Sequence, residues 1–196
     1  MEKKAFIDRI YPQAVRVTAG TGLFPDTLAA QAAHESNYGK SRLAKPDINN
    51  FFGIKARKTW PGRVASFSTN EEENGKLVKY QGTGLVYENY ATAIADKANP
   101  ITFFRAYDSE AQGLKNWVQF LQANKRYEKA GVFSAQTPAE QFEALKRAGY
   151  ATDSAYTSKL NRILAEIKKI SPGQIRAAGS IILPALLFGL YLILKK

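Results

Sequence analysis

An alanine-rich segment near the amino terminus constrains the fold more than any other stretch of the chain. Residues 29–33 read Ala-Ala-Gln-Ala-Ala, and Leu28 precedes them. Alanine has the highest helix propensity and a minimal side chain, so the segment predicts a thin helix that its neighbours approach closely. Pro25 suits the first turn of this helix, and Gly39 suits the stop after the last turn. We expect the rest of the chain to be organised around this helix.

Glu35 falls in the last turn of the predicted helix. A carboxylate there meets the negative end of the helix dipole, and partial burial would further raise the pKa of the carboxyl. A carboxyl that stays protonated near neutral pH is the general acid that cleavage of a glycosidic bond requires. The alternative is a solvated glutamate at a helix end, which is the commoner case for a glutamate taken alone.

The amino-terminal half combines helical and strand patterns. Apolar residues recur at helical spacing within residues 2–22, but Pro12 interrupts them, so we expect two short helical pieces. Residues 64–80 have strand-like alternation around an acidic turn at residues 70–75, whose Asn-Gly pair favours a short hairpin. Residues 91–98 are expected to form a loop or a short extra helix.

The carboxy-terminal half is mainly helical. Residues 101–107 predict one buried strand, and helices are then expected after the capping residues Ser109, Thr137 and Asp153. Gly149 suits the stop of the second of these helices. The last helix carries an apolar stripe of Tyr156, Leu160, Ile163 and Ile167. Helices that flank a small sheet in mid-chain indicate the α+β class.

The end of the sequence differs in composition from the rest. Residues 177–194 contain no charged side chain, and as a helix they would span roughly 27 Å, close to the ~30 Å hydrocarbon core of a bilayer. The sequence therefore predicts a folded domain at 1–171, a linker at 172–176 and a transmembrane anchor at 177–196. The alternative for the apolar segment is a core helix or a peripheral hairpin.

Composition excludes several classes of site. The chain has no cysteine, which excludes disulfides, thiolate metal sites and cysteine nucleophiles. Its one histidine, His34, argues against a histidine-rich metal site and a Ser-His-Asp triad. We therefore predict neither a metal nor a cofactor. The net charge of +11 favours a polyanionic partner, but without dense Lys/Arg blocks or a reader motif we expect no nucleic acid.

Four short elements occur in order between residues 5 and 170. They are 28–36 followed by Tyr38-Gly39; 50–56, read as Asn-Phe-Phe-Gly-Ile-Lys-Ala; the acidic segment 70–75 followed by 104–107; and 148–153 followed by Tyr156 and Lys159-Leu160. Together they resemble the glycoside hydrolase family 73 N-acetylglucosaminidases, which include the hydrolase domain of the flagellar rod-cap protein. The chain departs from that pattern at Asn37, where the family usually has glycine, and at residues 82–100, which look like an insertion.

The resemblance implies a lysozyme-like α+β fold with a small β-lobe, and hydrolysis of the β-1,4 bond after N-acetylglucosamine in peptidoglycan. It implies that Glu35 is the general acid and that Glu71 is the second carboxylate, with Glu73 as its rival. Tyr156 and Tyr150 match family positions that line the cleft, and core packing is the alternative for both. Either the second carboxylate activates water and the reaction inverts, or the N-acetyl group of the substrate assists and the reaction retains configuration.

Four other residues are predicted near the substrate, and a fifth beside the acid. Asn50 belongs to the second element of the resemblance, and Phe52 is expected to support the cleft wall. Tyr38 and Trp60 are candidates for stacking on sugar faces, from their residue type alone. His34, beside the general acid, is expected to pack rather than to tune it.

The anchor also bears on location. The amino terminus lacks the apolar core of a secretory signal, because two lysines are followed by Asp8 and Arg9. An anchor without a signal predicts a phage enzyme held in the virion membrane or the host inner membrane. Its partners would be peptidoglycan glycan strands, the lipid bilayer and other virion proteins. The alternative is a membrane-tethered wall-binding or structural protein without activity.

Overall fold

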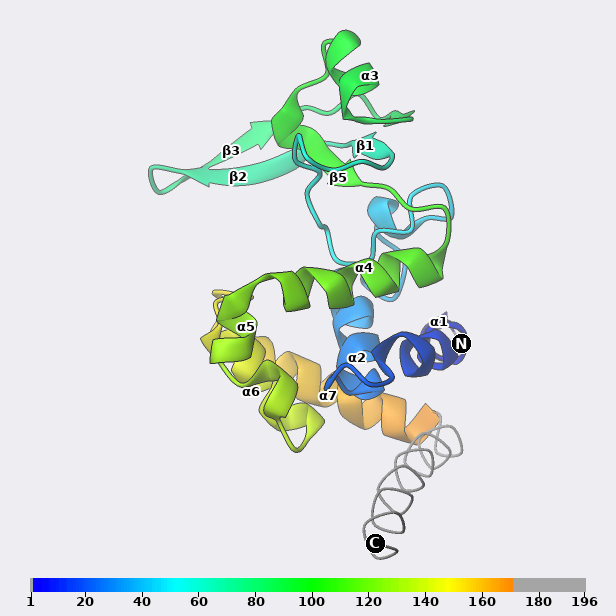
Figure 1. Ribbon diagram of the computed structural model, residues 1–196, viewed down its shortest axis with the longest axis vertical. Helices are drawn as coiled ribbons and strands as arrows, with labels where there is room; N and C mark the ends of the chain where they lie inside the picture. Colours follow the sequence, from blue (N-terminus) through cyan, green and yellow to red (C-terminus); the bar gives the residue numbers. More distant parts are fainter. Residues whose placement is uncertain (1, 171–196) are drawn as a thin grey trace, which may run out of the picture.

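Helix α2 (Pro25–Glu35) is the central element of a helical lobe (Figure 1). The computed structural model describes residues 2–170. The four alanines of residues 29–33 are fully buried, and α2 packs against α1, α6 and α7. The prediction of a thin, closely packed helix with Glu35 in its last turn is confirmed, and the helix ends at Glu35. The other helices of the lobe are α1 (Glu2–Thr18), α4 (Glu110–Ala123), α5 (Lys125–Lys129), α6 (Pro138–Arg147) and α7 (Tyr156–Ile170), with short 3-10 helices at Arg42–Ala44 and Val132–Ser134.

Helix α1 corrects the expectation of two helical pieces, because it continues through Pro12 without a break. A proline inside a helix removes one backbone hydrogen bond and crowds the preceding turn. Here Pro12 is partly exposed, whereas Phe6, Ile10 and Ala14 are buried against the rest of the lobe. Packing of this apolar face therefore outweighs the local cost of the proline.

The capping residues that the sequence predicts do begin the later helices. The Ser109 side chain accepts a hydrogen bond from the backbone N–H of Gln112, and Thr137 does the same for Glu140. Asp153 accepts from the N–H of Ala155 ahead of α7, whose apolar stripe is buried. The short helix α5 is the one α-helix of the described residues that the sequence did not predict.

The smaller lobe contains two separate antiparallel sheets and helix α3 (Figure 1). Strand β1 lies between β4 and β5 in the first sheet, and β2 pairs only with β3 in the second. The bounds are β1 (Val64–Ser66), β2 (Thr69–Glu73), β3 (Lys76–Tyr80), β4 (Val86–Tyr87), β5 (Phe103–Arg105), α3 (Tyr90–Ala95) and a 3-10 helix at Pro100–Thr102. The short helix expected within 91–98 is confirmed, whereas the strand expected over 101–107 is shorter.

The acidic segment is a strand rather than a turn, which corrects the sequence interpretation. Residues 70–73 belong to β2, and Glu71 pairs with Val78 of β3. The turn consists only of Asn74 and Gly75, with φ angles of 51° and 76°. Two central residues with positive φ match the twist of the strands, so the Asn-Gly pair sets the register of the hairpin.

Helix α4 lies along the boundary between the two lobes, where it meets the loop at residues 45–50 (Figure 1). Gly113 of α4 is buried, and a Cβ atom at this position would lie 2.1 Å from the carbonyl oxygen of Asn49. The loop backbone therefore lies directly against the helix at this point. The same loop leads into residues 50–54, so the contact helps to position the segment that carries Phe52.

The α+β class, mainly helical with a small β-lobe, is confirmed. Among residues 2–170 no helix has both the length and the apolarity needed to cross a bilayer. The predicted linker at 172–176 and the anchor at 177–196 lie outside the described residues.

Candidate active site

Glu35 is held at the end of α2 by a tight chain reversal. Ser36 caps the helix, and its hydroxyl accepts the backbone N–H of Gly39 at 2.8 Å. Asn37 and Tyr38 both adopt positive φ, at 49° and 54°. Asparagine tolerates this left-handed conformation better than most residues, which explains how Asn37 can stand where glycine is usual. Glu35 is therefore the last residue of α2, directly before the reversal.

Glu35 lines a groove of about 330 Å³. The groove lies between the 52–57 segment and Arg105 on one side, and α4, α5 and the loop before α7 on the other. It is lined by Glu35, Phe52, Gly53, Ile54, Lys55, Arg57, Arg105, Phe120, Arg126, Tyr127 and Tyr150. The predicted acid therefore lies in a concave site of a size that can receive a sugar ring.

The environment of Glu35 favours its protonated form. Burial raises the pKa of the Glu35 carboxyl to about 7, although part of the side chain is exposed to solvent. The raised pKa and the partial exposure are compatible, because the groove walls displace water from around the carboxyl while one side stays open. No ion pair to Glu35 occurs within residues 2–170, so no neighbouring cation opposes the shift.

Aromatic side chains form one wall of the groove. Phe52 stacks on Trp117 with ring centroids 5.1 Å apart, and the indole N–H of Trp117 donates to the Tyr150 hydroxyl at 3.0 Å. Tyr150 in turn stacks on Tyr156 at 6.1 Å. Burial is the main cause of the raised pKa of Tyr150, and the charge of Glu35 also contributes to it. The predictions that Phe52 supports the wall and that Tyr150 lines the cleft agree with this geometry.

Tyr156 lies behind the wall rather than on it. Its side chain is 1% exposed, its hydroxyl accepts a hydrogen bond from the Gln31 amide, and it does not line the groove. This position corrects the expectation that Tyr156 lines the cleft. The rings of His34 and Tyr156 pack in a T-shaped arrangement, with centroids 6.1 Å apart, as the packing interpretation predicts.

Tyr38 and Asn50 are also placed differently from expectation. The chain reversal carries Tyr38 to another side of α2, where its hydroxyl donates to Glu166 at 2.7 Å and its ring packs against Phe6. Asn50 is 1% exposed, and its amide binds the backbone of Ile54 and Arg105. Tyr38 therefore belongs to a different surface, and Asn50 fixes the loop that presents Phe52 to the groove.

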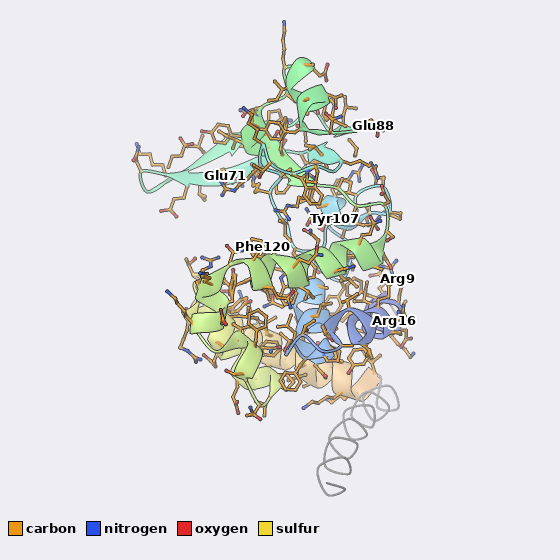
Figure 2. The ribbon with its side chains drawn as sticks, in the orientation of Figure 1. Arg9, Arg16, Glu71, Glu88, Tyr107 and Phe120 are labelled. Atoms are coloured by element: carbon orange, nitrogen blue, oxygen red, sulfur yellow. The ribbon has the colours of Figure 1, made fainter. Side chains whose placement is uncertain are left out.

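Glu71 lies in a second groove, of about 640 Å³, that adjoins the first. Lys55 and Arg57 line both grooves, and the Lys55 ammonium lies 2.6 Å from the Glu71 carboxylate. The hydrogen bond from Lys55 is the main cause of the lowered pKa of Glu71, so this carboxyl is ionised. Figure 2 shows Glu71 on the hairpin and Phe120 on α4, on the same side of the molecule.

Glu73, the rival second carboxylate, lies nearer the turn of the hairpin. It accepts a hydrogen bond from the Tyr80 hydroxyl and is exposed. It lines the groove of Glu71 but makes no hydrogen bond or ion pair with Lys55. The structure therefore connects Glu71, and not Glu73, with the groove of Glu35.

Trp60 lies on a third groove, of about 570 Å³, with Tyr107 and Asn116. Its indole N–H donates to the Arg63 carbonyl at 2.9 Å, and Arg105 lies over its ring at 4.6 Å. Arg105 therefore separates this groove from that of Glu35. Trp60 therefore does not line the groove of Glu35, and its stacking on a sugar face stays a prediction.

Several groove residues escaped the sequence analysis. Phe120 of α4, which lines the groove, was not identified. The cationic residues Arg57, Arg105 and Arg126 had no motif of their own, because they come together only in the folded chain. Within the described residues no group of three or more His, Cys, Asp or Glu side chains could hold a metal ion.

Comparison with known proteins gives a consistent result. Residues 11–169 match the glucosaminidase family, described as mannosyl-glycoprotein endo-β-N-acetylglucosaminidase. The peptidoglycan hydrolase FlgJ of Pseudomonas aeruginosa is 34% identical over 89% of this chain and 39% of its own length. A probable N-acetylmuramidase of Lactococcus lactis subsp. cremoris is 32% identical over 83% of this chain and 33% of its own length. The chain thus spans less than half the length of these relatives.

A solved structure shares the fold over nearly its whole length. The crystal structure of a mutant peptidoglycan hydrolase from Sphingomonas sp. A1 superimposes with a TM-score of 0.64 and 31% identity, covering 85% of this chain and 97% of that one. The helix-rich architecture with small sheets is therefore the lysozyme-like fold of these glycoside hydrolases. With this fold, and with a match that spans most of the sequence, the chain belongs to the glucosaminidase family.

Proposed function

We propose that this protein is a peptidoglycan hydrolase that cleaves the β-1,4 glycosidic bond after N-acetylglucosamine, with Glu35 as the general acid. The observation that carries the proposal is the Glu35 carboxyl, whose pKa burial raises to about 7 and which lines a sugar-sized groove. The similar proteins described as peptidoglycan hydrolases support the choice of substrate.

The reaction needs a proton on the leaving oxygen and stabilisation of an oxocarbenium-like transition state. Glu35 supplies the proton, because with a pKa of about 7 its carboxyl is protonated in a large fraction of the molecules at neutral pH. Glu71 is ionised, but it lies in the adjoining groove and is paired with Lys55. We therefore favour assistance by the N-acetyl group of the substrate, with retention of configuration, over activation of water by Glu71.

If the N-acetyl group assists, replacing Glu71 with glutamine should lower the hydrolysis rate by about tenfold rather than abolish it. The loss would reflect a displaced Lys55, which also lines the groove of Glu35. Initial rates on soluble peptidoglycan strands measure the effect. Glu73→Gln is the matched control, because it removes a carboxylate of the same strand that makes no contact with Lys55. A loss as large as that of Glu35→Gln would instead make Glu71 the base.

Hydrolysis should decline at alkaline pH. The general acid must be protonated, and the pKa of Glu35 is about 7. Above this value kcat/KM should fall by about tenfold for each pH unit. Rates on soluble strands between about pH 5 and about pH 9 test this, with circular dichroism at each pH to confirm that the chain stays folded. A rate that rises steadily through neutrality would contradict an acid role for Glu35.

The bond that is cleaved is identified by mass spectrometry of the released muropeptides. A reducing-end N-acetylglucosamine supports the proposal, whereas a reducing-end N-acetylmuramic acid indicates the activity named for the Lactococcus relative. A zymogram separates both outcomes from the second candidate, a wall-binding protein without activity. Glu35, free of any ion pair within residues 2–170, argues against that candidate.

The cellular setting is a separate proposal. The uncharged segment 177–194 would anchor the protein in a membrane, in keeping with a phage lysis enzyme or a virion component. Partitioning of the 196-residue chain with lipid vesicles tests the anchor, and its detection in purified particles tests the virion location.

A further inference from the structure

The groove that holds Glu35 is strongly cationic. Lys55, Arg57, Arg105 and Arg126 line it, whereas Glu35 is its only acidic residue. Lys55 is neutralised by Glu71 at 2.6 Å. No carboxylate of residues 2–170 lies within ion-pair distance of the three arginines. Three positive charges of this groove are therefore left without an anionic partner in the described part of the chain.

The surroundings of Arg105 and Arg126 hold these two side chains without neutralising them. Arg105 donates to the Asn116 side-chain oxygen at 2.7 Å and lies over the ring of Trp60 at 4.6 Å. Arg126 donates to the Tyr127 hydroxyl at 2.6 Å and lies over the same ring at 4.7 Å. Amide, hydroxyl and aromatic partners position a guanidinium but do not cancel its charge.

None of these four cations forms an ion pair with Glu35. A guanidinium in contact with Glu35 would favour the ionised carboxylate and lower its pKa. Instead burial raises the pKa of Glu35, and no cation counteracts this shift. The charge of the groove is thus separated from the proton donor and is available to a bound ligand.

We propose that Arg57 and Arg126 bind the free carboxylates of the peptide stems of the substrate, so that the groove selects stem-bearing strands over bare glycan. This inference rests on the proposed function. Both side chains are exposed, and they come from opposite sides of the groove, the 52–57 segment and helix α5. Sugar hydroxyls and N-acetyl groups are neutral, whereas stem carboxylates match the planar, two-pronged donor geometry of arginine.

The test compares three soluble substrates that lack wall phosphate polymers: uncross-linked strands with intact stems, the same strands with stem carboxylates converted to amides, and strands stripped of stems. For the unmodified 196-residue chain, KM should be about tenfold lower on intact stems than on the other two substrates. In Arg57→Gln and Arg126→Gln the ratio of KM on the other two substrates to KM on intact stems should fall. In the double variant this ratio should approach one. A higher KM on amidated stems than on intact stems would show that the preference depends on carboxylate charge rather than on the size of the peptide.

Lys125→Gln is the matched control, because Lys125 is the exposed neighbour of Arg126 on α5 and does not line the groove. This variant should keep the preference for intact stems. Equal KM values for all three substrates with the unmodified chain would overturn the inference, as would arginine variants that retain the preference. Either result would leave the hydrolysis itself measurable, whereas absence of cleavage on every substrate would refute the proposed function instead.

Discussion

Replacing Glu35 with glutamine is expected to lower the rate of peptidoglycan hydrolysis by about a thousandfold, the scale of a lost general acid. Glutamine keeps the size and hydrogen-bonding capacity of the side chain but has no proton to donate to the leaving oxygen. Glu35 makes no hydrogen bond or ion pair within residues 2–170 that the substitution would break. Release of soluble muropeptides from purified peptidoglycan measures the loss.

The variant should also remain folded, which separates a catalytic from a structural role. The folded-state pKa of Glu35, about 7, exceeds that of an unfolded glutamate, so the native state holds the extra proton between the two values. The contribution of Glu35 to stability therefore falls as pH rises from about 4.5 to about 7. Glu35→Gln lacks this dependence and should gain stability relative to the unmodified chain over that window, in urea unfolding.

Glu128→Gln provides the matched control for the activity loss. Glu128 is an exposed residue of α5 outside the groove, so its substitution removes one carboxylate elsewhere on the surface. It should retain the hydrolysis rate of the unmodified chain. Near-normal lysis by Glu35→Gln would show that Glu35 is not the general acid.

Replacing Gly113 with alanine is expected to destabilise the protein by about 3 kcal/mol, at the upper end of the usual cost of overpacking. In an isolated helix the change would stabilise, because glycine is less favourable than alanine by about 1 kcal/mol. Here the new Cβ would lie 2.1 Å from the Asn49 carbonyl oxygen, so the helix or the loop must move. The midpoint of thermal unfolding should fall by about 10 °C.

Lys115→Ala tests whether the cost comes from this contact, because Lys115 is exposed on the same helix. Its substitution should change stability by less than about 0.5 kcal/mol. Gly113→Ala with unchanged or increased stability would show that the loop at residues 45–50 can shift freely away from α4.

Local sequence signals predicted those parts of the fold that depend on neighbouring residues. The end of α2, the caps at Ser109 and Thr137, and the hairpin turn at Asn74-Gly75 all follow from residues within a few positions of one another. Pro12 misled the analysis because tertiary packing of α1 overrides its local cost. Residues 70–73 misled it because cross-strand pairing with β3 makes a strand of a charged segment.

The positions of site residues were predictable from local signals and not where contacts join distant positions. Glu35 does lie at the end of α2 and line a groove, as predicted, because both its helix-end position and its motif are local. Tyr38 was misplaced, because the reversal at residues 36–39 turns it to another surface. The approach of Lys55 to Glu71 depends on how the hairpin folds back, and no local pattern encodes it.

The β2–β3 hairpin can change in sequence at little cost to the stability of the fold. None of its residues is buried, and its two strands pair with no other strand of the described chain. Most substitutions there therefore leave the hydrophobic interior untouched, so selection can rewrite the hairpin at little cost to folding. Because Glu71 reaches Lys55 from this same hairpin, new sequences in it would change the charge beside Lys55 while Glu35 on α2 stays fixed.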